Sequence, residues 1–307
     1  MLKTIFLFYA FNIIAINYAV TYEITPGRFG DNLLNYMHAK WISFKYKIPL
    51  LYKPFIFSEN LLMHKNELKY ENEYQKFNKK IILSEINKID LTITEKILYI
   101  VNYFPEGFYE RNFCKNYEGG KWYYFDTDWE NKLFKAELLK NIKPNYQFND
   151  VIKIPDNLIS VAIHLRRGGS FDNQNVIKAF PMKFIDDEFY FQEIENLSNY
   201  FNNQKIYVHI FTDDEKTLNI LDIYKKKFID KKNIAFNIRK LDNNHQSNIL
   251  EDFFSMLKFD CLIHSESNYS LTASFLGNFK YKSRPTFYET INNKIIYLNI
   301  LRTIKDN

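Results

Sequence analysis

Two adjacent arginines, Arg166 and Arg167, followed by two glycines stand out in the stretch SVAIHLRRGGSFDN. A guanidinium keeps its charge at physiological pH and presents a rigid fork of donors that fits phosphate oxygens. Gly168 and Gly169 let the backbone approach a bulky ligand and adopt positive φ angles. The chain has only 8 glycines in 307 residues, so this pair indicates an anion site. A surface arginine pair closing an exposed turn is the alternative interpretation.

Two more polar loops, Thr212–Asp214 and Ser265–Ser270, also follow predicted strands. The second loop enters a predicted helix, whose first amides and dipole favour an anion. Because parallel strands end at one edge of a sheet, we expect these loops and the arginine loop to converge there. A diphosphate held between the arginines and the helix N-terminus is typical of a nucleotide-sugar donor. Arg166 would stabilise the charge that grows on the departing phosphate, without a metal.

Strands and helices alternate in two halves of the chain, which predicts an α/β fold with two Rossmann-like domains facing a central cleft. The domains are expected at 21–154 and 155–307. Amphipathic stretches rich in Tyr and Lys suggest helices from about 53 to 150, with a turn at EGGKW. The predicted strands lie at Tyr22–Thr25, IPLLY, Ile159–His164, KIYVHIF, IAFNI and DCLIH. The predicted helices lie at Leu33–Tyr46, Phe189–Phe201, from a cap at Thr212 to about Phe228, and at ILEDFFSMLKF.

Composition limits the function classes. The hydrophobic fraction of 46% and charged fraction of 25% are typical of a globular protein. The net charge of +5 comes from scattered lysines, which argues against a nucleic-acid partner. Cys114 and Cys261 cannot form a disulfide framework or a metal site by themselves. No metal-binding motif appears, so we expect no metal and no cofactor.

The first twenty residues, MLKTIFLFYAFNIIAINYAV, have one early lysine and then an apolar stretch from Ile5 to Ile16. This pattern resembles a signal peptide or a membrane anchor, although Asn17 occupies the place of a small residue near the cleavage site. It predicts a protein of the secretory pathway or periplasm, associated with a membrane if the segment is retained. A buried first strand or helix of a cytoplasmic protein is the alternative.

The segment HLRRGG resembles the His-x-Arg-Arg-Gly-Asp motif of GDP-fucose-dependent fucosyltransferases, most closely the α-1,2 group in glycosyltransferase family 11. Three further segments resemble this family in the same order: PGRFGDNLLNYMHAKW, VHIFTDDEKTL and EDFFSMLKFDCLIHSESNYSLTASFLG. The first of them is also similar to the Gly-Arg-Phe-Gly-Asn loop of protein O-fucosyltransferases. The resemblance implies a metal-independent, inverting glycosyltransferase of the GT-B fold. It would move fucose from GDP-fucose to a glycan hydroxyl, with an α-1,2 linkage to galactose.

The resemblance also implies residue roles. Arg166 would meet the β-phosphate and the departing oxygen, and Arg167 would support the loop. His164 and Asp252 would lie near the guanine. The other residues assigned to substrate binding are Thr212, Asp213, Ser267, Asn268, Tyr269 and Ser270 on the donor side, and Gly30, Asp31 and Asn32 on the acceptor side.

Three departures from the family pattern limit these assignments. Gly169 replaces the motif's aspartate, Gly30-Asp31-Asn32 replaces Gly-Asn-Gln, and Leu271-Thr272 replaces two tryptophans. A general base must deprotonate the acceptor hydroxyl, and Asp31 and Asp172 both remain candidates. Alternatives to the α-1,2 enzyme are a protein O-fucosyltransferase-like enzyme, a non-catalytic nucleotide-sugar-binding protein, and an interaction protein on a Rossmann scaffold.

Overall fold

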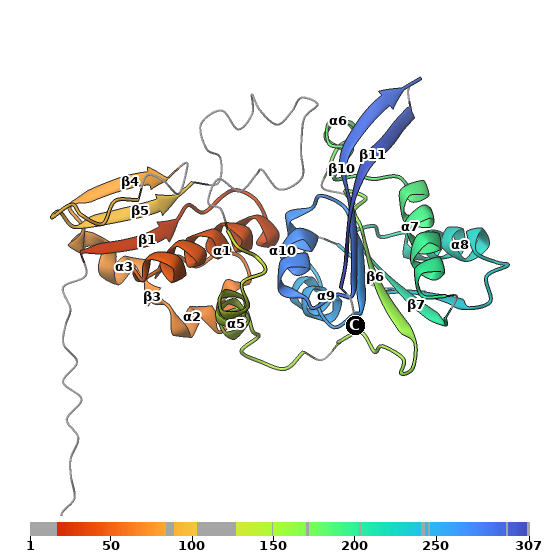
Figure 1. Ribbon diagram of the computed structural model, residues 1–307, viewed down its shortest axis with the longest axis horizontal. Helices are drawn as coiled ribbons and strands as arrows, with labels where there is room; N and C mark the ends of the chain where they lie inside the picture. Colours follow the sequence, from red (N-terminus) through yellow and green to blue (C-terminus); the bar gives the residue numbers. More distant parts are fainter. Residues whose placement is uncertain are drawn as a thin grey trace, which may run out of the picture.

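The protein is a mixed α/β structure with two main parallel sheets, seen here in a computed structural model (Figure 1). The described residues are 17–83, 89–102, 127–148, 150–169, 172–202, 204–240, 243–244, 246–292 and 294–305. In these ranges, no helix has the length and apolar character needed to cross a membrane. The expected leader up to residue 16, the turn EGGKW and Cys114 lie outside them. A leader therefore stays a prediction.

The first half is built on a small parallel sheet of order β1-β5-β4. The strand expected at Tyr22–Thr25 starts earlier, because the β-prone run YAVTY is buried from Ala19 to Tyr22 and pairs with the strand ILYIV. The expectation of helices between 53 and 150 was wrong for KKIIL and ILYIV, which form β4 and β5. The elements are β1 (Tyr18–Tyr22), α1 (Phe29–Tyr46), β2 (Leu51–Tyr52), α2 (Met63–Asn66), β3 (Leu68–Lys69), α3 (Tyr70–Glu73), β4 (Lys79–Leu83), β5 (Ile97–Val101) and α5 (Lys132–Asn141).

The second half is a larger sheet of order β11-β10-β9-β6-β7-β8, parallel except for the β10–β11 hairpin. When β6 is counted as the first strand, the parallel strands have the doubly wound order 3-2-1-4-5. The elements are β6 (Ile159–Leu165), α6 (Gln174–Ala179), α7 (Asp187–Tyr200), β7 (Ile206–Thr212), α8 (Thr217–Lys227), β8 (Ile234–Ile238), α9 (Ile249–Met256), β9 (Cys261–His264), α10 (Asn268–Leu276), β10 (Tyr281–Ile291) and β11 (Lys294–Ile304).

Two differences from the expected elements in this half have local causes. Thr212 does not cap α8, because the residues after it form turns: the Thr212 hydroxyl accepts from the Asp214 amide at 3.2 Å, and Asp214 accepts from the Lys216 amide at 2.7 Å. The helix therefore begins only at Thr217. The β10–β11 hairpin was not predicted, and Figure 1 shows it reaching beyond the rest of the sheet.

One hydrophobic cluster spans both halves of the molecule. Alternate β6 residues point to opposite faces, so Val161 and Ile163 pack with α7 and α8 while Ala162 faces the other side. That other side belongs to a cluster that also contains α1 and the small sheet, together with Phe253 of α9 and Ala273 of α10. In Figure 1, α1 and α10 meet in the middle of the molecule. The GT-B arrangement and a domain boundary at residue 154 stay predictions.

Candidate functional site

The chain reverses its winding between β6 and β9, which is where doubly wound sheets bind ligands, beyond the carboxyl ends of the strands. His164 and His264 are opposite each other at the ends of these two strands. The arginine loop follows the first histidine, and the Ser265–Ser270 segment follows the second. The fold therefore places the two segments that were predicted to hold an anion next to each other.

Arg166 lies at the centre of an ion-pair cluster and is only 7% exposed. Its guanidinium pairs with Asp172 and with Asp213. Asp213 comes from the loop after β7 and also accepts hydrogen bonds from the Arg167 amide at 2.7 Å and the Gly168 amide at 3.1 Å. All three predicted loops therefore converge at this edge of the sheet, although Gly169 supplies no carboxylate there. The carboxylate beside Arg166 within its own loop is Asp172.

The loop needs its glycine at position 168. The residue has a φ of +90°, and an added Cβ would lie 3.0 Å from the Cβ of Asp172 and 3.4 Å from the ring of Phe184. A residue with a side chain at this position would have a strained backbone conformation, and its Cβ would crowd Asp172. The tight turn lets the loop wrap the Asp213 carboxylate while it directs Arg166 into the cluster.

Arg28, which the sequence analysis did not assign to the site, reaches the cluster from the first half. It precedes α1, is partly exposed, and its guanidinium lies 3.5 Å from Asp172. The two residues are 144 positions apart. The only signal in the sequence was its place inside the quoted loop PGRFGDN, directly after Pro26 and Gly27 and just before the helix.

The N-termini of α1 and α10 also meet at the site. A Cβ on Gly30 would lie 2.6 Å from the Cα of Tyr269, so only glycine permits this approach. Asp31 bridges the two helix ends, because its carboxylate accepts from the Arg28 amide at 3.0 Å and from the Asn268 side chain at 2.6 Å. Two helix N-termini, each with a partial positive charge, therefore face one region.

Several predicted ligands are already engaged inside the protein. Asn32 is 2% exposed, and its amide holds the loop before α1 through Thr25 and Gly27. The Ser270 hydroxyl donates to carbonyl oxygens of its own turn. Arg167 bonds to the Ile185 carbonyl and pairs with Asp187, which agrees with a loop-supporting role. Ser267 is the N-cap residue of α10 and makes no capping bond with its side chain.

His164 is neutral, and one of its ring nitrogens, Nδ1, makes no hydrogen bond within the described residues. Burial lowers its pKa to about 4, and the nearby Arg166 charge adds to that shift while Asp213 opposes it. Its ring lies 5.4 Å from the ring of Tyr269. The buried Nδ1 atom has no hydrogen-bond partner in the part of the chain that the structure describes. Since buried polar atoms are normally paired, this atom is suited to meet a ligand.

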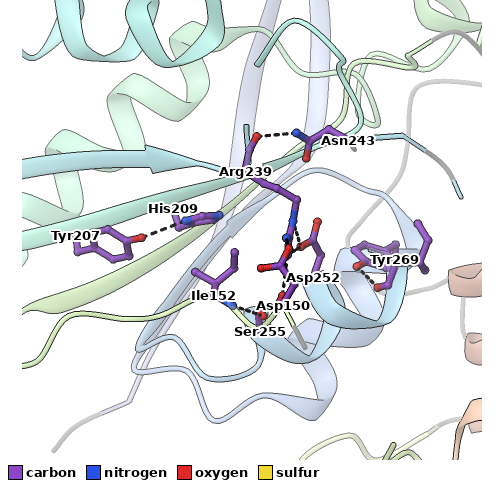
Figure 2. A network of polar contacts seen from close by, with 10 residues as sticks. Asp150, Ile152, Tyr207, His209, Arg239, Asn243, Asp252, Ser255 and Tyr269 are labelled. Carbon is purple, nitrogen blue, oxygen red and sulfur yellow. Dashed lines mark hydrogen bonds and ion pairs between the residues drawn. The ribbon is translucent and has the colours of Figure 1, made fainter. Parts of the chain in front are cut away.

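Asp252 belongs to a second ion-pair cluster. Figure 2 shows the Arg239 side chain directed at Asp252 and Asp150. Both the Nε and Nη2 atoms of Arg239 donate to one Asp252 oxygen, at 3.0 and 2.7 Å. Burial raises the pKa of Asp252 to about 6, although the Arg239 guanidinium opposes that shift. Asp252 is therefore an ion-paired residue of α9, and its partner Arg239 carries no signal in the sequence.

Among the described residues, no group of three or more His, Cys, Asp or Glu side chains is placed to hold a metal ion. Cys261 is a buried thiol in β9.

No protein-family model and no curated protein matches the sequence. Solved structures do resemble the fold. A mutant of Arabidopsis thaliana FUT1 in complex with GDP is 10% identical, with a TM-score of 0.50 over 86% of this chain and 70% of that one. Fucosyltransferase NodZ from Bradyrhizobium is 9% identical, with a TM-score of 0.48 over 92% and 98% of the two chains. POFUT1 in complex with GDP-fucose is 10% identical, with a TM-score of 0.46 over 86% and 96%. The chain therefore has a fold similar to that of FUT1.

Proposed function

We propose that this protein is an inverting, metal-independent glycosyltransferase that moves fucose from GDP-fucose to a glycan hydroxyl, with galactose as the acceptor sugar and an α-1,2 linkage. The observation that carries the proposal is the position of the Arg166 loop. It lies at the point where the sheet reverses its winding, beside the α10 N-terminus and Arg28. The fold likeness to FUT1, which was solved with GDP, supports a nucleotide as the ligand.

The donor would bind with its diphosphate at the α10 N-terminus, where Ser267 and Asn268 begin the helix. The guanidinium of Arg166 has five N–H donors, which is more than its two carboxylate partners use. Arg166 would therefore direct some of these donors to the phosphate oxygens. The neutral His164 would offer its unpartnered Nδ1 atom to the nucleoside. Asp252 would accept the N–H groups of guanine with the oxygen that Arg239 does not use.

Loss of GDP from fucose leaves negative charge on the terminal phosphate, and the preformed positive groups at the site would stabilise it. The hydroxyl of the acceptor would attack the sugar carbon from the opposite side and lose its proton to a carboxylate. We assign this base to Asp31, which lies at the start of α1 on the side of the first half. Asp172 is committed to two guanidiniums, Arg166 and Arg28.

A donor screen tests the proposal. Purified protein in EDTA is mixed with GDP-fucose, GDP-mannose or a UDP-sugar, and nucleotide release is measured with and without galactose-terminated glycans. We expect nucleotide release with GDP-fucose and not with the other two donors, and we expect the glycan to accelerate this release. Release that stops in chelator, or a preference for another donor, would contradict the assignment. Asp31→Asn should abolish transfer and change GDP affinity far less than it changes transfer.

A non-catalytic nucleotide-sugar-binding protein is the second candidate. It is favoured by one observation: both carboxylate oxygens of Asp31 and both of Asp172 already accept hydrogen bonds. This candidate predicts that GDP-fucose raises the melting temperature of the protein, while no acceptor, whether glycan or peptide, produces free GDP.

A further inference from the structure

A short segment before α7, Pro181–Ile185, lies across the point where the winding reverses. The Met182 carbonyl accepts a hydrogen bond from the Glu266 amide at 2.9 Å, which ties the segment to the loop after β9. The Ile185 carbonyl accepts from the Arg167 side chain at 2.9 Å, which ties it to the loop after β6. The segment is thus fixed to both loops that form the candidate donor site.

Lys183 is presented between these two attachments. Its ammonium lies 5.2 Å from the centre of the Phe184 ring, and the Arg166 guanidinium lies 5.7 Å from the same ring. That ring packs against Gly168 of the arginine loop. Lys183 and Arg166 therefore lie beside the same aromatic ring.

The charge of Lys183 is not compensated by a direct partner. Arg166 pairs with two carboxylates, Asp172 and Asp213, whereas no carboxylate of the described chain lies within ion-pair distance of the half-buried Lys183. Burial lowers the pKa of Lys183, and the nearby Arg166 charge adds to the shift, which Asp172 opposes. An ammonium that is partly removed from water and lacks a carboxylate gains from meeting an anion.

We propose that Lys183 is a donor-binding residue whose ammonium contacts the diphosphate of the nucleotide sugar. This inference rests on the proposed function, because it assumes a nucleoside diphosphate at the switch between β6 and β9. Asp172 and Asp213 neutralise part of the positive charge of Arg166, and Lys183 adds positive charge at the same place. As the sugar departs, the same ammonium faces the growing charge on the leaving diphosphate.

The test compares Lys183→Gln, Lys183→Arg and the control Lys178→Gln, which removes the same charge from the exposed face of α6. Affinities for GDP are measured by calorimetry, and affinities for guanosine by competition with labelled GDP. Loss of one charge-assisted contact is expected to weaken GDP binding by about ten- to a hundredfold in Lys183→Gln. Guanosine binding should change less than about twofold, Lys178→Gln should match the unaltered protein, and Lys183→Arg should keep most of the GDP affinity.

Each other outcome has a definite meaning. Unchanged GDP binding in Lys183→Gln would overturn the inference and leave the proposed function standing. An equal loss for GDP and guanosine, with a lower melting temperature, would show a role in holding the two loops together and would also overturn it. If the unaltered protein binds neither GDP nor GDP-fucose, the proposed function falls and the inference falls with it.

Discussion

Two buried arginines of the second half, Arg166 and Arg239, have similar partners and different surroundings. Each is at most 8% exposed, each pairs with two aspartates, and each has a buried histidine nearby, His164 or His209. The Arg166 cluster is assembled from loops at the carboxyl ends of strands, beside two helix N-termini and an uncompensated lysine. The Arg239 cluster instead joins β8 to α9 and to the segment before β6.

The difference shows that two buried ion-pair clusters of similar composition can have different roles. At Arg239, the side chain also bonds to the Asp150 backbone, and its own carbonyl accepts from Asn243 at 2.6 Å, so the cluster ties three segments together. At Arg166, the partners have alternative donors: Asp172 has Arg28, and Asp213 has two backbone amides. The Arg239 cluster stabilises the fold and leaves one Asp252 oxygen for the nucleoside, whereas the Arg166 cluster can rearrange around an anion.

The largest expected effect is on stability at Arg239. Arg239→Ala leaves Asp252 buried without its guanidinium, which typically costs about 3–5 kcal/mol of the free energy of unfolding. Urea denaturation measures the change. Replacing both partners, as Arg239→Met with Asp252→Leu, should recover most of the loss, since no buried charge then lacks a partner. A single mutant that loses less than about 1 kcal/mol would show that the two clusters do not differ in this way.

The next effect is on turnover at Arg166. Arg166→Ala should lower kcat for nucleotide release from GDP-fucose by about 10²–10³, the usual cost of one preorganised electrostatic contact. Arg166→Lys should lose nearly as much, because it keeps the charge without the planar fork. Arg167→Ala should lose less. The free energy of unfolding should fall less in Arg166→Ala than in Arg239→Ala, and the reverse order would contradict the comparison.

The smallest effect concerns acid stability at His209. Burial lowers its pKa to about 3, and the Arg239 charge adds to that shift. Between that value and the ordinary value near 6.5, the unfolded chain binds a proton that the folded chain does not, so stability is lost as the pH falls through this window. His209→Gln should therefore reduce the pH dependence of the free energy of unfolding by up to about 1.4 kcal/mol per pH unit. Urea titrations at pH 5 and 6 measure it.

Tyr207→Phe is the matched control, because it removes only the hydroxyl that lies 3.2 Å from the His209 ring. It should leave the pH dependence unchanged. A slope in His209→Gln that equals that of the unaltered protein would mean that His209 does not titrate differently in the folded chain.

Local patterns in the sequence were enough to predict much of the second half. Short apolar runs such as IAFNI became the expected strands, and the polar loops after β6, β7 and β9 meet because parallel strands end together. The β10–β11 hairpin and the strands β4 and β5 were missed, because short runs rich in Ile, Tyr and Lys look alike in strands and in helices.

The missed parts of the site share one cause. Arg28 meets Asp172 over 144 positions, and Arg239 meets Asp150 over 89. Such pairs follow from the tertiary arrangement and leave no local pattern. Lys183 lies in the segment FPMKF, which carries no recognisable motif. Its proposed role depends on two contacts of its neighbours: the Met182 carbonyl accepts from the Glu266 amide, and the Ile185 carbonyl accepts from the Arg167 side chain. By contrast, the positive φ angles of Gly168 and Gly169 could be predicted from the sequence, because glycine adopts them far more readily than other residues.

The close approach of Gly30 to Tyr269 has a consequence for synthesis on the ribosome. Asp31 and its partner Asn268 are 237 positions apart, and α1 packs into the same core as α10. At about 5–20 residues per second, the first helix emerges roughly 10 to 50 seconds before its packing partner is made. During that interval the apolar face of α1 has no α10 to cover it. The core that α1 shares with α10 can therefore be completed only after residues 268–276 have been made, late in synthesis.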